Sequence, residues 1–356
     1  IRPGSDTAHL AILGYDPRGV YTGRGPFEAM GIGMDIQPGD IALRCNFATV
    51  DADMNILDRR AGRIRAPETT ELAEALDGME IDGVECFVRE GTEHRAVLVL
   101  RGDGLSPDIT DADPGAGDSV QGVVALSEEA EFTAHVVNEF VRESHERLRL
   151  HPTNRKRAAA GLPEANILVP RGAGEFPYIE PFPERFGMSA CCIAGVGLVR
   201  GICKACGLDI FPLPDVCNGT VESDLLKKAE CAMEALEEYD FVLMNFKAPD
   251  ILGHDGDARG KAEIVKRIDA VAGYLRRNMP DDLVVAITCD HCTPCNLEDH
   301  SGDPVPLTIY THGCVRDEAR EYSESGCSHG FIGRIRGTDL VNICMDLANR
   351  TVKFGS

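Results

Sequence analysis

Helical and extended patterns alternate through the second half of the chain, which leaves few architectures open. Apolar residues recur at helical spacing over residues 223–238, and a compact apolar strand follows at 241–246. The order repeats with a helix over 258–278 and a strand over 283–289, and a third strand begins near Val305. Such alternation predicts parallel α/β structure, in which ligands bind beyond the carboxyl ends of the strands.

The first half of the chain has a different pattern. Between about residues 35 and 170, period-two segments such as ALRCNFATV and HRAVLVLRG are separated by clusters of Gly, Asp and Pro. This pattern predicts a mixed α+β insertion. We therefore expect two domains, with residues 1–34 and 171–356 forming an α/β core and residues 35–170 forming an inserted domain.

Composition argues against several classes of partner. The 356 residues include 36 Lys and Arg against 58 Asp and Glu, and the resulting net charge of −22 opposes binding to nucleic acid or to an anionic membrane surface. Many of the fourteen cysteines lie in apolar stretches such as SACCIAGVGLVRGICKACGL, which is typical of free thiols in a reducing compartment. We expect a cytoplasmic protein with a small-molecule substrate and with no nucleic-acid or membrane partner. The oligomeric state stays open.

Candidate metal ligands follow the predicted strands. In FKAPDILGHDGD, Asp250 and His254 are four residues apart, so both side chains lie on one face of a helical turn. Asp290 and His291 directly follow the strand LVVAITC, and His300 precedes the next strand. Taken singly, these segments are as readily explained by a helix cap, a polar loop and a surface histidine. Together they supply two Asp and three His on one side of the predicted sheet, enough for two divalent cations.

The cysteines of CDHCTPC allow another interpretation. Cys289, Cys292 and Cys295 have the spacing that opens an iron–sulfur or zinc motif, and Cys203 and Cys206 are possible further ligands. Against this interpretation, Cys289 ends a predicted buried strand and GICKACGL has the pattern of an apolar helix. A non-catalytic metal or iron–sulfur binding protein is therefore the remoter alternative.

Several ordered motifs resemble those of one known family over essentially the whole chain. They are PGSDTAHLAILGYDP, DRRAGRI, HRAVLVL, FKAPDILGHDGD, CDHCTPC and HSGDPVPL. The chain resembles the archaeal-type, cofactor-independent phosphoglycerate mutases of the alkaline phosphatase superfamily. The resemblance implies an alkaline-phosphatase-like α/β core, with a mostly parallel sheet flanked by helices, and assigns the inserted α+β domain as a substrate-binding lid.

The resemblance also implies a reaction and its cofactors. It predicts a glycolytic and gluconeogenic isomerase that interconverts 3-phosphoglycerate and 2-phosphoglycerate through phosphoserine and requires no 2,3-bisphosphoglycerate. The resemblance implies that the phosphorylated residue is Ser5, which also suits the N-cap of a helix. Two divalent cations, of manganese or else of zinc, cobalt or magnesium, would be held by Asp250, His254 and His300 and by Asp290, His291 and the Ser5 oxygen. A metal-dependent phosphohydrolase or another phosphomutase of the superfamily is the nearer alternative.

The family places one more metal-binding aspartate after a first strand that precedes the nucleophile. This chain starts only four residues before Ser5. We therefore expect a chain truncated at its amino terminus, with one metal site weakened by the loss of a carboxylate.

An anionic substrate in so acidic a protein requires a local concentration of arginine, because guanidinium groups bind phosphate and carboxylate bidentately. The segments LDRRAGRIR, EHRAVLVLR and PRGAG meet this need, although charge clusters are also common on solvated surfaces. We predict substrate binding by Arg60, Arg63, Arg95 and Arg171 as a group. Further candidates are Lys247 as a phosphate ligand and Asp58 or His94 as the proton acceptor on glycerate.

Overall fold

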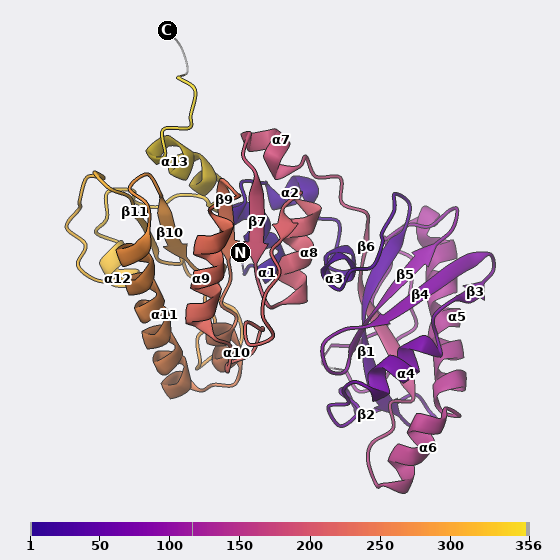
Figure 1. Ribbon diagram of the computed structural model, residues 1–356. Helices are drawn as coiled ribbons and strands as arrows, with labels where there is room; N and C mark the ends of the chain where they lie inside the picture. The colour runs from indigo at the N-terminus through magenta and orange to yellow at the C-terminus, as the bar shows by residue number, and fades with distance from the viewer. Residues whose placement is uncertain (1, 116, 354–356) are drawn as a thin grey trace. The chain divides into compact units, whose positions relative to one another are not determined.

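The computed structural model describes residues 2–115 and 117–353 (Figure 1). Two compact units divide the chain. Unit 1 contains the residues up to Tyr21 and those from Ile179 onward, and unit 2 is the continuous segment Thr22–Tyr178. The boundaries expected from the sequence are 34/35 and 170/171, so the inserted unit begins earlier and ends later in the structure.

Helix α3 (Gly25–Gly31) explains the earlier start of unit 2. Its Ala29 packs with Ala42 and Val97 in a small apolar cluster on the sheet of that unit. Gly25 permits this contact, because a Cβ at Gly25 would lie 2.0 Å from the carbonyl oxygen of Ala42.

An antiparallel six-stranded sheet forms the centre of unit 2. Its strands run in the order β2-β1-β5-β4-β3, and β6 also pairs with β1. The strands are β1 (Ile41–Val50), β2 (Ile56–Asp58), β3 (Met79–Ile81), β4 (Val84–Glu90), β5 (Arg95–Arg101) and β6 (Ile167–Glu175). The other helices of the unit are α4 (Glu68–Glu74), η1 (Glu128–Ala130), α5 (Glu131–Leu148) and α6 (Pro152–Ala159).

The two faces of this sheet have different surroundings. Leu43 and Phe47 of β1 pack with Phe140 of α5 in the main core, as the period-two pattern predicts. On the opposite face α3 covers one part, and polar side chains occupy another part. Strand register pairs Arg44 with Arg171 and Asn46 with Arg95, so these four residues share one face.

Two separate sheets lie in unit 1. A parallel sheet has the order β8-β7-β9, and β10 pairs with β11 in a second sheet. These strands are β7 (Ala190–Ile193), β8 (Asp209–Ile210), β9 (Phe241–Met244), β10 (Val285–Thr288) and β11 (Leu307–Tyr310). The helices are α1 (Ser5–Ile12), α2 (Pro17–Val20), α7 (Phe182–Phe186), α8 (Gly197–Ala205), α9 (Leu225–Ala235), α10 (Ala248–His254), α11 (Ala258–Asn278), α12 (Glu324–Cys327), η2 (Gly337–Asp339) and α13 (Leu340–Leu347).

The helix–strand alternation is confirmed, and the sheet β8-β7-β9 of unit 1 is parallel, as expected for the core. The expectation fails for β10 and β11, which are antiparallel, with Val285 opposite Tyr310, and the largest sheet of the chain, that of unit 2, is also antiparallel. A parallel pair needs a long crossover, usually through a helix. Residues 289–306 contain no helix, so the chain turns back and β11 pairs with β10 in the reverse direction.

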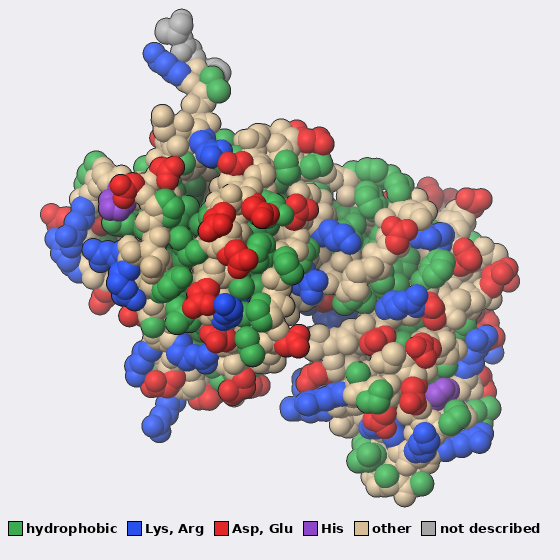
Figure 2. All heavy atoms as spheres, in the orientation of Figure 1, with side chains coloured by type: hydrophobic (Ala, Val, Ile, Leu, Met, Phe, Trp, Pro, Cys, Tyr) green, Lys and Arg blue, Asp and Glu red, His purple; other side chains and the backbone are tan. Residues whose placement is uncertain are grey.

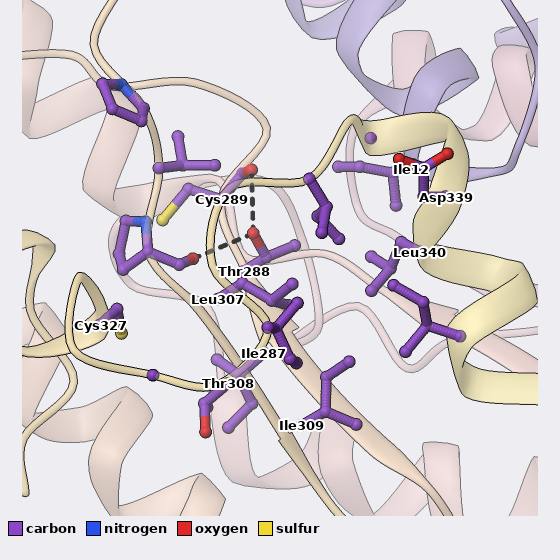
Figure 3. A pocket seen from close by; sticks show the side chains of 18 of the residues that line it. Ile12, Ile287, Thr288, Cys289, Leu307, Thr308, Ile309, Cys327, Asp339 and Leu340 are labelled. Carbon is purple, nitrogen blue, oxygen red and sulfur yellow. Dashed lines mark hydrogen bonds between the residues drawn. The ribbon is translucent and has the colours of Figure 1, made fainter. Parts of the chain in front are cut away.

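A broad groove borders the β10–β11 pair (Figure 3). Ile287, Leu307 and Ile309 of the pair line it, together with Ile12 and Leu340 at the ends of α1 and α13. Among the described helices, none is long and apolar enough to cross a membrane. On the face shown in Figure 2, acidic and basic side chains are interspersed over both units.

Candidate active site

Ser5 is the first residue of α1 and is buried, with 7% of its surface exposed. Gly4 occupies the N-cap position, where a Cβ would lie 2.4 Å from Asp6 Oδ1. The Asp6 carboxylate accepts a hydrogen bond from the Thr7 backbone N–H (2.9 Å) and another from the Tyr21 hydroxyl (2.8 Å). The start of α1, and with it Ser5, is therefore held by close packing and by partly buried hydrogen bonds to Asp6.

Three predicted metal ligands converge in unit 1. Asp250 and His254 lie on α10, and His300 comes from the loop between β10 and β11. Asp250 Oδ1 is 3.5 Å from Nε2 of each histidine, and the two Nε2 atoms are 3.2 Å apart. Ligand atoms that surround one tetrahedral ion at 2.0–2.1 Å are about 3.3 Å from each other. This spacing fits a single divalent cation.

The orientation of both histidines supports the same conclusion. The Nδ1 atom of His254 lies 2.8 Å from the carbonyl oxygen of Glu298, and Nδ1 of His300 lies 2.9 Å from that of Pro3. A carbonyl can only accept, so both Nδ1 atoms carry the proton. In the neutral rings the lone pairs of both Nε2 atoms are then directed at the Asp250 carboxylate, and a cation satisfies all three groups.

The second predicted group surrounds Ser5. Its hydroxyl oxygen is 3.0 Å from Nε2 of the buried His291, and that nitrogen is 3.2 Å from Asp290 Oδ2. Burial alone would raise the pKa of Asp290, but the neighbouring side chains of His291, His9 and Ser5 hold this pKa well below its usual value. Asp290 is therefore an anion beside Ser5, and the structure brings together all three predicted members of this group.

Lys247 lies at the first metal group, as expected from its position in the sequence. Its ammonium nitrogen is 2.6 Å from Asp250 Oδ2. Burial would raise the pKa of Asp250, but Lys247 and a hydrogen bond from Thr293 keep this pKa below its usual value. Asp250 consequently stays ionised, with Oδ1 directed at the two histidines.

His9 is a residue of this site that the sequence analysis misses. It lies one helical turn after Ser5, its Nδ1 is 2.7 Å from the Ser5 carbonyl oxygen, and the same nitrogen is 3.8 Å from Asp290 Oδ2. Burial lowers the pKa of His9. The spacing of four residues from Ser5 was the available signal, because it places His9 on the same face of the helix as Ser5.

The predicted substrate-binding arginines all lie in unit 2. Arg171 Nη1 contacts Asp113 Oδ2 at 3.3 Å. Within the described part of the chain, Arg60, Arg63 and Arg95 form no ion pair. These cations are therefore available to an anion.

Arg44 is a further cation that the sequence analysis misses. Burial and the guanidinium groups of Arg24, Arg95 and Arg171 lower its pKa to about 10. Its Nε atom is buried and has no hydrogen-bond partner among the described residues. An arginine at an alternating position of an apolar strand was the signal for it, since such a charge is costly to bury without a partner.

The two candidate proton acceptors differ in availability. Both carboxylate oxygens of Asp58 accept backbone hydrogen bonds, from Arg60 N–H at 2.8 Å and Gly62 N–H at 2.9 Å. His94 is 6% exposed, and burial, with Arg95 and Arg60 nearby, lowers its pKa to about 4. His94 is thus a neutral ring whose buried Nδ1 has no partner among the described residues.

The cysteine interpretation finds no support in the geometry. Sγ of Cys292 faces the carbonyl oxygen of Pro304, whereas Sγ of Cys295 faces that of Leu252. Among the described residues, the cluster of three candidate ligands close enough to share one ion consists of Asp250, His254 and His300, and it contains no cysteine.

Comparison with known proteins places the chain in one family. A family model described as 2,3-bisphosphoglycerate-independent phosphoglycerate mutase matches residues 1–154. The protein of that name from Methanopyrus kandleri is 48% identical over 366 residues, which cover 100% of this chain and 86% of the relative. The 2,3-bisphosphoglycerate-independent phosphoglycerate mutase 1 of Methanocaldococcus jannaschii is 46% identical over 360 residues, which cover 100% and 87%.

Two solved structures share the fold. A Pyrococcus horikoshii protein has a TM-score of 0.86 at 36% identity, covering 100% of this chain and 86% of that one. The cofactor-independent phosphoglycerate mutase from Thermoplasma acidophilum has a TM-score of 0.70 at 35% identity, covering 98% and 88%. Identity at this level along the whole chain shows that it belongs to the 2,3-bisphosphoglycerate-independent phosphoglycerate mutases, isomerases that interconvert 3-phosphoglycerate and 2-phosphoglycerate.

Proposed function

We propose that Ser5 accepts the phosphoryl group during this isomerisation. The observation that carries the proposal is the position of the buried Ser5 Oγ, 3.0 Å from the Nε2 atom of the buried His291, which in turn lies 3.2 Å from the Asp290 carboxylate. In the first half-reaction the Ser5 Oγ–phosphorus bond forms and the bond to the 3-oxygen of the substrate breaks. In the second, the 2-oxygen of glycerate takes the phosphoryl group from Ser5.

The residues that would hold two divalent cations fit that role. Asp250, His254 and His300 would hold one, and Asp290, His291 and Ser5 the other. Bound cations favour the ionised serine hydroxyl and offset the negative charge of the transferred phosphoryl group. Carboxylates and imidazoles suit manganese, and they also accept zinc, cobalt or magnesium.

Unit 2 supplies the cations that an anionic substrate requires. The four arginines of the initial prediction lie there, and Arg44 joins Arg95 and Arg171 on one face of the sheet. Four of these cations lack a carboxylate partner within the described residues, namely Arg44, Arg60, Arg63 and Arg95. This supports binding of the phosphate and carboxylate groups of phosphoglycerate by this unit. The role of unit 2 as a lid stays a prediction.

His94 is the better candidate for the proton acceptor on glycerate. Asp58 already accepts two backbone hydrogen bonds, whereas the free Nδ1 of His94 can receive a proton from a glycerate hydroxyl. A bound anion would also stabilise the imidazolium that results.

Trapping of the phosphoenzyme tests the proposed role of Ser5. The protein is mixed with 3-phosphoglycerate labelled in its phosphate, quenched in acid and digested. We expect label on the peptide that contains Ser5, because a phosphoserine survives acid whereas a phosphohistidine is lost. Label on another residue, or turnover with no labelled protein at any quench time, would contradict the proposal.

Replacement of Arg44 by alanine should weaken substrate binding. Loss of one charge-assisted hydrogen bond costs about 1.5–3 kcal/mol, so we expect kcat/KM for 3-phosphoglycerate to fall by about 10- to 150-fold, mostly through KM. Steady-state kinetics measure this effect. Arg142→Ala is the matched control, because Arg142 is an exposed arginine of the same unit that pairs with Glu139. Equal KM values for Arg44→Ala and Arg142→Ala would refute a substrate-binding role of Arg44.

The His94 ring should titrate far below an ordinary histidine. We expect a pKa of about 4 in the folded protein, against about 6.5 when unfolded. The unfolded chain then binds this proton more readily, so His94 lowers the stability of the folded state as pH falls from about 6.5 to about 4. NMR titration of 13C-labelled histidine rings measures the pKa, and the spectrum of His94→Asn identifies the resonance.

Bound 3-phosphoglycerate should raise the pKa of His94, because a nearby anion favours the imidazolium. A pKa near 6.5 in the free protein, or one that 3-phosphoglycerate leaves unchanged, would exclude the proposed role of His94.

A further inference from the structure

Thr293 connects the two groups of metal ligands through hydrogen bonds. It lies in the loop between β10 and β11, two residues after His291. We propose that Thr293 is a positioning residue, which orients His291 toward Ser5 and Asp250 toward the two other histidines. The inference rests on the proposed two-metal function and assigns a role to a side chain that would touch neither metal nor substrate.

The direction of the hydrogen bonds carries the first step. Thr293 Oγ1 donates to Asp250 Oδ1 at 2.7 Å and lies 3.1 Å from His291 Nδ1. A hydroxyl has a single proton, and Thr293 uses it on the carboxylate. His291 must therefore donate its Nδ1–H to Oγ1.

This contact selects one tautomer of His291. A neutral imidazole with a proton on Nδ1 keeps the lone pair on Nε2, the atom that lies 3.0 Å from Ser5 Oγ and 3.2 Å from Asp290 Oδ2. Only this tautomer leaves Nε2 of His291 able to bind a cation beside Ser5. The Thr293 hydroxyl thus performs for His291 the task that backbone carbonyls perform for His254 and His300.

The surroundings of Thr293 hold it in place. Its exposed fraction is 4%, and its carbonyl oxygen accepts a hydrogen bond from Lys261 Nζ at 2.7 Å. Gly253 of α10 lies against it, since a Cβ at Gly253 would be 2.5 Å from this carbonyl oxygen. Gly253 lies between the ligands Asp250 and His254, so the helix with these ligands and the loop with His291 meet at Thr293.

Two substitutions separate a positioning role from simple packing. Thr293→Val keeps the branched shape and removes the hydroxyl, whereas Thr293→Ser keeps the hydroxyl and removes the methyl group. A role in packing predicts that valine is tolerated and serine is harmful. Positioning of His291 and Asp250 predicts the reverse.

The experiment measures Mn²⁺ binding by equilibrium dialysis and steady-state kinetics on the intact protein. We expect Thr293→Val to weaken Mn²⁺ binding by about 10- to 100-fold, as other residues that orient metal ligands do. At saturating Mn²⁺, kcat should still fall by about tenfold or more. KM for 3-phosphoglycerate should change less than about threefold, because the proposed substrate-binding arginines are unaltered. Thr293→Ser should stay within about threefold of the wild type in all three quantities.

Thr288→Val is the matched control. Thr288 ends β10 in the same region, but its hydroxyl donates to the backbone carbonyls of Pro306 at 3.0 Å and Cys289 at 3.5 Å, and to none of the predicted Asp and His ligands (Figure 3). Its Mn²⁺ affinity and kcat should equal those of the wild type. The inference is overturned if Thr293→Val binds Mn²⁺ and turns over like the wild type, or if Thr293→Ser is as impaired as Thr293→Val.

Failure of the inference and failure of the proposed function give different results. If the wild type binds Mn²⁺ and Asp250→Asn removes part of that binding, the two-metal function stands. The Thr293 variants then test only the positioning role of Thr293. If the wild type binds no Mn²⁺, or Asp250→Asn changes nothing, the two-metal proposal is wrong and the inference falls with it.

Discussion

Replacement of Ser5 by alanine should reduce phosphoglycerate mutase activity by at least about 10⁴-fold. The loss follows from the proposed chemistry, because both half-reactions form or break a bond at Ser5 Oγ. The structure supports this expectation by placing the buried Oγ 3.0 Å from His291 Nε2 at the start of α1. A coupled assay that follows 2-phosphoglycerate measures the loss.

Thr7→Ala provides the control for this experiment. Thr7 lies on the same turn of α1, and its hydroxyl donates to the Gly4 carbonyl oxygen at 3.3 Å. The Thr7→Ala variant should keep activity within a few-fold of the wild type, and Ser5→Ala should keep the wild-type circular dichroism spectrum. A Ser5→Ala protein with more than a few per cent of wild-type activity would show that phosphoryl transfer does not pass through Ser5.

Removal of divalent metal should have the second largest effect. We expect a chelator to abolish activity and Mn²⁺ to restore it, because a metal ion contributes several kcal/mol of charge stabilisation to the transition state. Asp250→Asn keeps the shape of the ligand and removes its charge. This variant should lose about 10²- to 10⁴-fold in kcat/KM, measured at a fixed Mn²⁺ concentration near the wild-type dissociation constant.

The Asp250→Asn variant should also lose the stabilisation that a bound cation provides. A ligand present at about 100 times its dissociation constant stabilises the folded state by about 2.7 kcal/mol, so Mn²⁺ should raise the Tm of the wild type and raise that of Asp250→Asn much less. His135→Ala is a control, because this exposed histidine of unit 2 pairs with Asp82 and belongs to neither metal group. Equal Mn²⁺-dependent shifts in Tm for Asp250→Asn and the wild type would argue against the metal centre.

The local elements of unit 1 were predictable from apolar periodicity. The predicted helix over 258–278 matches α11, and the predicted strand at 241–246 contains β9. Periodicity reports which face of an element is buried, and burial in this region follows the same pattern. Strand pairing was not predictable in this way, because the antiparallel partnership of β10 and β11 depends on the path of the loop between them.

The ligand residues of the candidate site were also visible in the sequence, since polar Asp and His residues directly follow apolar strands. Their partition into two groups came from the family resemblance, and the distances are consistent with it. The contributions of His9, Thr293 and Arg44 were not predicted. Each depends on a contact with a residue distant in sequence or on burial that a single strand or helix does not reveal.

The sequence by itself determined the types of candidate ligand and the elements that carry them, because these depend on local spacing, and the family motif supplied Ser5 as the proposed nucleophile. Only the tertiary structure decided how the ligands are oriented. The proton positions on His254, His300 and His291 depend on Glu298, Pro3 and Thr293, acceptors that folding alone brings within 3.1 Å of the rings. A hydrogen bond requires a donor and an acceptor at the right distance and angle, and that geometry exists only in the packed chain.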